Sequence, residues 1–171
     1  MSVSVDKLKL YYSGASTLGQ MQDSAFKSLG GFRSGVMIPN ASFNNIFDEI
    51  GKQELGEGQQ VCKCIFIKNE DPTNAITNLN LYITGNQSFE KIKFGVSIPT
   101  DETIPVQFMN SQNELPYNFI FYESYNLNDA VVLSSSIAAS KLIALWLVRE
   151  IDPQTTIPII VDQPQLNFNW T

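Results

Sequence analysis

The chain has 171 residues, a net charge of −6 and a pI near 4.5. Only 16% of its residues are charged, whereas globular chains carry about 25%, and it contains no histidine and two cysteines. These values exclude histidine-based triads, histidine-ligated metals and multi-cysteine zinc sites. They also argue against direct nucleic-acid binding, because affinity for phosphates rests on Lys and Arg.

The basic residues are scattered along the chain. The densest group, Lys63, Lys68, Lys91 and Lys93, contains no run of charge, and we interpret it as solvated strand faces. Polarity comes instead from amides, with 15 Asn and 11 Gln. Neighbouring molecules can cover a surface of this kind without burying many unpaired charged side chains.

Residues 1–35 are predicted to form an N-terminal arm. A short apolar stretch, Leu8 to Tyr12, could be a strand, and a long segment rich in Gly, Ser and Gln follows it. Gly30-Gly31 and Gly35 break regular structure. Because the segment has few apolar residues for its length, we expect an irregular arm that becomes ordered on neighbouring molecules.

The beginning of the chain lacks the basic start and apolar run of a signal peptide. The most apolar stretch, Ile137 to Val148, is shorter than the roughly 20 residues that span a bilayer. We therefore expect a protein made in a host cytoplasm, with no membrane partner.

Residues 36–152 are predicted to form the main domain. Near its start, Phe43, Ile46, Phe47 and Ile50 have the i, i+3, i+4, i+7 spacing of a short helix, and an irregular turn with buried aromatics is the alternative. The glycine-containing residues 51–60 are predicted to form a loop.

Residues 60–69 form the strongest strand pattern of the chain. They are β-branched and aromatic, and they end at Asn69-Glu70-Asp71-Pro72, which is typical of a turn. Cys62 and Cys64 lie on one face of such a strand. We interpret them as two buried thiols, because a redox motif or a metal site would need a different spacing or further ligands.

Further strands follow at short intervals. Residues 75–84 alternate between Ile76, Asn78, Asn80 and Tyr82 on one side and Leu79, Leu81 and Ile83 on the other. Residues 89–98 indicate a third long strand, and residues 104–109 and 117–122 indicate two short ones. Strands spaced in this way favour an antiparallel β-sandwich.

Residues 129–151 are ambiguous between helix and strand. Alanine and leucine favour a helix, but the run Ser134 to Ser136 argues against a continuous one, and we favour two strands with a turn around Ala138 to Lys141. Residues 153–171 contain three prolines and end in aromatics. They are predicted to form an extended tail, either at a sheet edge or as a clamp.

No catalytic constellation is present. The paired carboxylates, such as Asp48-Glu49 and Asp101-Glu102, adjoin turn residues, and no nucleophile elbow or phosphate-binding loop occurs. We expect no catalytic residue, no metal site and no cofactor, and therefore not an enzyme. Surplus aromatics are typical of interface cores. The candidate interface residues are Tyr11, Tyr12, Phe32, Tyr122, Tyr125, Phe168 and Trp170.

Four stretches resemble a known pattern. Asn45-Ile46-Phe47-Asp48 is similar to an "LFDD" turn, and Cys64 to Asn69 is similar to a "YRCIYVKN" strand. Ile76 to Ile83 is similar to an "NVKVWI" strand, and Ala144 to Ile151 to a closing "ALWVRRTV" strand. The chain thereby resembles small β-sandwich virion proteins of tailed bacteriophages, with crAss-like phages as one candidate source.

The resemblance covers roughly a third of the chain, and two positions depart from it. Lys63 stands where the pattern has arginine before the cysteine, and Glu150 replaces a second arginine. The glycine-rich residues 13–35 and the proline-containing tail are not part of the pattern.

The resemblance implies an immunoglobulin-like sandwich and a structural role in a virion, either in capsid decoration or in head–tail assembly. The expected partners are major capsid or portal and connector subunits, and a homo-oligomer or many-copy array. An alternative is a carbohydrate- or host-receptor-binding module that stacks sugars on Tyr122 and Tyr125.

Overall fold

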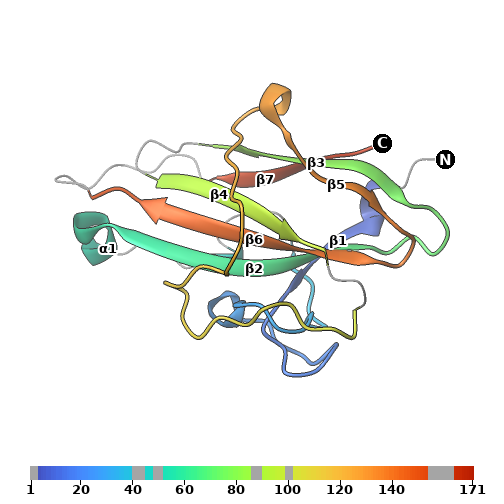
Figure 1. The fold of residues 1–171 in the computed structure, drawn as a ribbon, viewed down its shortest axis with the longest axis horizontal. Coiled ribbons are helices and arrows are strands. Elements are labelled where there is room, and N and C mark those ends of the chain that lie inside the picture. Colours follow the sequence, from blue (N-terminus) through green and yellow to red (C-terminus); the bar gives the residue numbers. More distant parts are fainter. Residues whose placement is uncertain (1–3, 40–44, 48–51, 86–89, 99–101, 154–163) are drawn as a thin grey trace.

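Two antiparallel sheets face each other across the main core of the computed structural model, so the predicted all-β sandwich is confirmed (Figure 1). The structure describes residues 4–39, 45–47, 52–85, 90–98, 102–153 and 164–171. The four-stranded sheet has the order β1 (Leu8–Tyr12), β2 (Gln59–Asn69), β6 (Leu142–Ile151) and β4 (Glu90–Ser97). The three-stranded sheet has the order β5 (Val131–Ile137), β3 (Ile76–Thr84) and β7 (Gln165–Asn169).

Helical structure among the described residues is confined to short pieces. Three are 3-10 helices, namely η1 (Val5–Lys7), η2 (Ala25–Lys27) and η4 (Leu127–Asp129), and one is the α-helix α1 (Lys52–Glu57). The prediction of a loop over 51–60 is therefore wrong at α1, because one helical turn fits between its flanking glycines. The helix predicted from Phe43 to Ile50 lies mostly outside the described residues.

The main core lies between the two sheets. It includes Ile65 and Ile67 of β2 and Leu145 and Leu147 of β6, which come from the faces of those strands that point toward the three-stranded sheet. Ile65 stands opposite Leu145 in a register that joins β2 and β6 over ten residue pairs. Each side chain of this size stabilises the fold by about 1.5–3 kcal/mol when buried.

Strand β3 confirms the predicted strand but not its strict alternation. Leu79, Leu81 and Ile83 are buried as expected, and Ile76 is buried as well, although the alternation places it on the other side. Asn78 between them has a φ of +49°, in the left-handed region. This residue shifts the phase of the strand, so that both Ile76 and Leu79 point into the core.

The ambiguous segment 129–151 folds as two strands, as we favoured. β5 and β6 are separated by the turn at residues 138–141, where Ser140 has a φ of +60°. In β6 every residue except Glu150 is buried, which explains why its sequence shows no polar alternation.

Residues 13–39 and 102–122, which we call the loop layer, lie mostly over the outer face of the four-stranded sheet (Figure 1), whereas Val36 and Ile38 run along the edge of β1 and pack against the main core. This corrects the prediction of a separate arm at 1–35, because β1 is part of the sheet and residues 13–35 pack on it. The short strands predicted at 104–109 and 117–122 are also absent as named strands. Only single bridges form there, Gly31 with Val106 and Phe94 with Tyr122.

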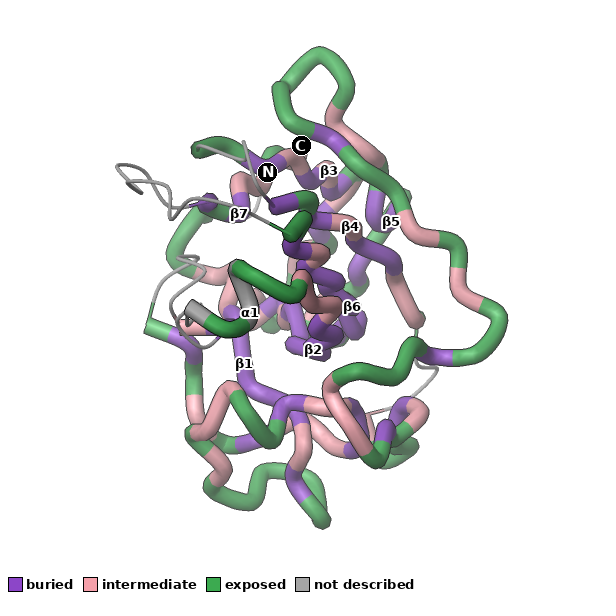
Figure 2. Tube along the Cα trace, turned by 90° about the vertical axis from the view of Figure 1, so that its left-hand side faces the viewer, coloured by how far each residue is buried: buried purple, intermediate pink, exposed green. Residues whose placement is uncertain are grey.

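The C-terminal residues belong to the sandwich. β7 pairs with β3 over five residues, which places it at an edge of the three-stranded sheet, and Phe168 and Trp170 pack against the main core. Residues 165–169 thus take the sheet-edge position that was one of the two alternatives predicted for the tail, but as a strand of the sandwich and not as a segment outside it, whereas residues 154–163 lie outside the described residues. Figure 2 shows buried residues concentrated in the central strands and exposed ones in the loops.

Candidate interaction surfaces

The loop layer covers a second apolar cluster. The cluster includes Trp146 and Val148 of β6 and Cys62, Cys64 and Phe66 of β2, all of which alternate with residues of the main core. Val106 and Met109 of the loop layer pack on it. The two central strands are thus apolar on both faces, and they require cover on both sides.

Backbone hydrogen bonds join the loop layer to the part of β2 that extends beyond β1. The amides of Cys62 and Cys64 donate to the carbonyls of Gln112 (2.6 Å) and Ser28 (2.7 Å). The Ser13 hydroxyl donates to the Cys64 carbonyl (2.7 Å). Because a buried polar group without a partner is costly, these bonds explain how irregular segments lie against a strand edge.

The loop layer approaches the sheet most closely at Gly30. This residue has a φ of +96°, and a Cβ at this position would overlap the Gln107 carbonyl and lie 2.9 Å from the Trp146 ring. The Gly30 amide donates to the Ser13 hydroxyl (3.1 Å). Glycine is required here both for its backbone conformation and for space.

Lys63 is fully buried, which corrects its assignment to a solvated strand face. Its ammonium group donates to the side-chain oxygen of Gln112 (2.9 Å) and to the carbonyl of Phe26 (3.3 Å). It also lies 5.2 Å from the centre of the Phe26 ring. The spacing of lysines in the sequence carries no sign of this, because the acceptors come from the two distant loop segments.

A cluster of charged groups ties the loop layer to β1 and β2. Glu102 lies 3.7 Å from the Arg33 guanidinium and 3.3 Å from the Lys68 ammonium, and Lys68 lies 3.5 Å from Glu70. Tyr11 donates to Glu70 (2.8 Å), and Arg33 lies over its ring at 4.7 Å. Burial and the bond to Glu70 raise the pKa of Tyr11 to about 12.

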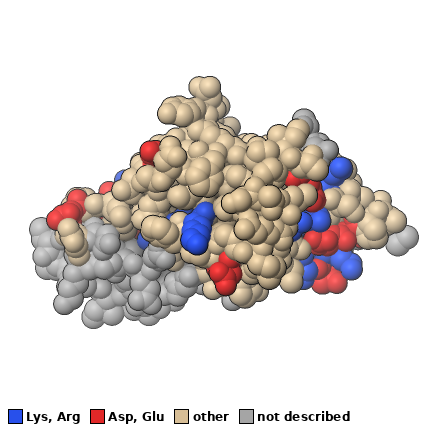
Figure 3. Space-filling model, turned by 90° about the horizontal axis from the view of Figure 1, so that it is seen from below, with Lys and Arg blue, Asp and Glu red and all other residues tan. Residues whose placement is uncertain are grey.

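The outward face of the loop layer is rich in apolar side chains and poor in free charge. It contains five charged residues, of which Arg33 and Glu102 are paired in the cluster above, and Asp23, Lys27 and Glu114 are exposed. Figure 3 shows a face on which charges gather mainly at one end. The exposed apolar side chains are Leu18, Met21, Phe26, Met37, Ile104, Phe108, Leu115, Tyr117, Ile120 and Tyr122. Their number in two neighbouring loop segments makes this layer the candidate interaction site.

A second surface feature is a groove of about 360 Å³ beside the edges of β4 and β5, whose lining combines apolar side chains with polar atoms. Residues 118–122 form one wall of it, and β5 forms another. No charged residue lines it within the part of the chain that the structure describes. Its lining consists of Gly95, Val96, Ile98, Asn118, Phe119, Ile120, Tyr122, Val131, Val132 and Leu133.

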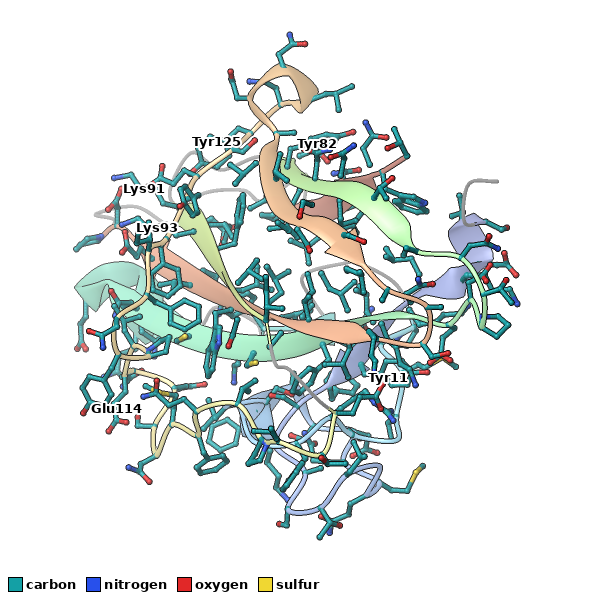
Figure 4. The ribbon with its side chains drawn as sticks, turned by 45° about the vertical axis from the view of Figure 1, so that its right-hand side comes forward. Tyr11, Tyr82, Lys91, Lys93, Glu114 and Tyr125 are labelled. Carbon is teal, nitrogen blue, oxygen red and sulfur yellow. The ribbon has the colours of Figure 1, made fainter. Side chains whose placement is uncertain are left out.

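The structure does not bring the candidate interface residues together. Tyr11 and Tyr12 are buried within this chain, and Phe32, Phe168 and Trp170 are half-buried. Tyr122 and Tyr125 are exposed, and Figure 4 places Tyr125 well away from Tyr11. Five of the seven candidate interface aromatics are thus buried or half-buried and contribute to the packing of this chain. Apart from Tyr122, the exposed apolar residues of the loop layer were not among the predicted interface residues, because single apolar residues in polar loops carry no periodic pattern.

Burial governs the titratable groups of the two sheets. Cys62 and Cys64 are free, buried thiols, as predicted. Burial raises the pKa of Cys62 to about 12 and that of Cys64 well above its ordinary value. Burial likewise raises the pKa of Glu90, and Arg149 opposes this rise. Because burial keeps the Cys62 and Cys64 thiols protonated, these two cysteines are inert.

The predicted turn after β2 is confirmed and is built by side-chain hydrogen bonds. The Asp71 carboxylate accepts from the amides of Asn74 (2.8 Å) and Thr73 (2.9 Å), which lowers its pKa to about 2. The buried Asn69 side chain donates to the carbonyls of Asn74 and Ile137 (2.8 and 3.1 Å). Among the described residues, no group of acidic or cysteine side chains is arranged to hold a metal ion, and no helix could cross a bilayer.

The geometry thus presents a loop layer with many exposed apolar side chains and three exposed charges, and a groove with no charged lining among the described residues. Comparisons with protein-family models, curated proteins and solved structures found no match. The surfaces themselves and the sequence resemblance are therefore the basis for assigning a role.

Proposed function

We propose that this chain is a structural protein of a tailed-bacteriophage virion, and that it docks on capsid or connector subunits through the outward face of its loop layer. The observation that carries this proposal is the number of exposed apolar side chains in the loop layer, beside only three exposed charged residues in the same layer. Capsid decoration is favoured over a connector role, because it needs no contact between an acidic chain and DNA.

The physical basis of the proposed docking is the burial of apolar surface with few unpaired charges buried alongside it. Each 100 Å² of apolar surface removed from water contributes about 2.5 kcal/mol, whereas an unpaired charge buried with it costs several kcal/mol. Within residues 13–39 and 102–122, all of which the structure describes, the exposed charged residues are Asp23, Lys27 and Glu114. The sequence resemblance to small virion sandwiches supports the same role, with many copies on one particle.

Mass spectrometry of purified particles from the phage that encodes this chain tests the proposal. We expect the chain at stoichiometric copy number, and its absence from washed particles would refute the proposal.

Site-directed variants test whether the loop layer is the docking surface. Met21→Glu and Tyr117→Glu alter side chains that are 76% and 82% exposed, so both should fold normally and lose attachment to particles.

Val5→Glu is the matched control. Val5 is 77% exposed but lies in η1, outside the loop layer, so this variant should fold and attach like the native chain. Equal attachment of all three variants would show that the loop layer is not the docking face.

A second candidate function is binding of a carbohydrate or host receptor. It is favoured by Tyr122 and Tyr125, which are exposed on either side of Glu123. The Tyr125 hydroxyl donates to the Glu123 carboxylate (3.1 Å). Aromatic rings beside a carboxylate suit a sugar face and its hydroxyls. A glycan array decides this alternative, and the absence of binding across a broad panel rejects it.

A further inference from the structure

The strand edges of the two sheets are covered unequally. On the free side of β1, the Ile38 amide donates to the Leu10 carbonyl (2.8 Å). On the free side of β4, Phe94 and Tyr122 exchange two hydrogen bonds (2.8 and 2.9 Å). β5 pairs with β3 on one side, and none of the segments that the structure describes is hydrogen-bonded to its other side.

The open edge of β5 lacks the features that prevent pairing with another chain. Its seven residues, Val131–Ile137, include no charge and no proline, and Val132 is 57% exposed. Natural edge strands are usually protected by lysine, by proline or by shortness. The other edge of this sheet is β7, which has five residues and follows Pro164.

Charges of opposite sign flank β5. Asp129 stands two residues before the strand and Lys141 four residues after it, and both are exposed. If two copies pair antiparallel, the Asp129 end of one copy lies beside the Lys141 end of the other, twice by symmetry. In a parallel pairing, like charges meet instead. The strand ends are therefore complementary to those of a second copy in one orientation only.

We propose that β5 is a self-association edge, where two copies pair antiparallel and join their three-stranded sheets into one six-stranded sheet. The uncharged groove beside β5 has space for apolar side chains of the partner copy without stranding an ion. This inference does not depend on the virion role, because the pairing edge is β5, which lies outside the loop layer, although Ile120 and Tyr122 of that layer also line the groove.

The expected association is weak for the isolated chain. One strand pair and its groove bury less than the roughly 1,200 Å² of a stable interface, so a dissociation constant on the order of micromolar is expected. Repetition of the contact between many copies would strengthen it greatly.

Sedimentation velocity of the full chain from about 1 to about 500 µM tests the proposal, because this range spans a micromolar dissociation constant. We expect a concentration-dependent monomer–dimer equilibrium. Val132→Lys places a charge on the exposed edge and should abolish the dimer. Asp129→Lys and Lys141→Asp should each weaken it about tenfold, and the double variant should restore it.

Lys91→Asp is the control, because Lys91 is similarly exposed but lies in β4. It should leave the dimer unchanged, and thermal unfolding should show that every variant folds. A native chain that stays monomeric at all concentrations overturns the proposal and leaves the edge for a strand of another protein. A dimer that survives Val132→Lys, or a double variant no stronger than the single ones, overturns it as well. Particle attachment through the loop layer is measured separately.

Discussion

Replacing Gly30 by alanine should destabilise the whole domain if the loop layer is an integral part of the fold. Gly30 has a φ of +96°, and a left-handed conformation costs a residue with a side chain about 1 kcal/mol. The new methyl group would also overlap the Gln107 carbonyl. The two backbones must then separate.

This separation would weaken two hydrogen bonds beside Gly30. The Gly30 amide donates to the Ser13 hydroxyl (3.1 Å), and the Met109 amide donates to the Leu29 carbonyl (2.8 Å). Each is worth about 1 kcal/mol. We therefore expect Gly30→Ala to lower the free energy of unfolding by about 3 kcal/mol, which corresponds to a fall in Tm of roughly 6–12 °C for a chain of this size.

Gly19→Ala is the matched control. Gly19 has a φ of +76°, but a Cβ at that position meets no atom within 4 Å, so only the backbone cost of about 1 kcal/mol applies. Urea unfolding followed by circular dichroism and tryptophan fluorescence measures both variants. The reasoning is refuted if Gly30→Ala costs no more than Gly19→Ala.

Two further predictions concern pH and the turn after β2. The free energy of unfolding should fall as pH rises from about 9 to about 12, because the buried Cys62 thiol keeps its proton in the folded state, where its pKa is about 12, and loses it in the unfolded state. Urea midpoints between pH 8 and about 11 measure this fall, and Cys62→Ala should make it shallower; an unchanged slope would count against the assignment. Asn69→Ala should lower the free energy of unfolding by about 3 kcal/mol, because it removes the two N–H donors that the carbonyls of Asn74, Ile137 and Ala138 share and the oxygen that accepts from the Asp71 amide. Thermal unfolding checks this, with the exposed Asn126→Ala as a comparison, because the Asn126 side chain only caps η4 by accepting from the amides of Asn128 and Asp129.

The sequence by itself determined much of the sandwich. β2 is a β-branched and aromatic run, β3 and β4 alternate over much of their length, and turn residues such as Asn69 and Gly85 stand at strand ends. The split of 129–151 into two strands also followed from local features, since three serines interrupt the helical pattern. Local backbone preference and face burial act within a few residues, so they are legible in a single chain.

The tertiary structure alone decided where the irregular segments lie. Residues 13–35 have too few apolar residues to predict a packed segment, yet they cover Trp146 and Cys64 and bury Lys63 together with Gln112. The predicted aromatic interface became part of the fold at Tyr11 and Tyr12, and the exposed apolar surface arose from loop residues without periodicity. The physical reason is that central strands apolar on both faces require cover, and only the three-dimensional pairing decides which segment supplies it.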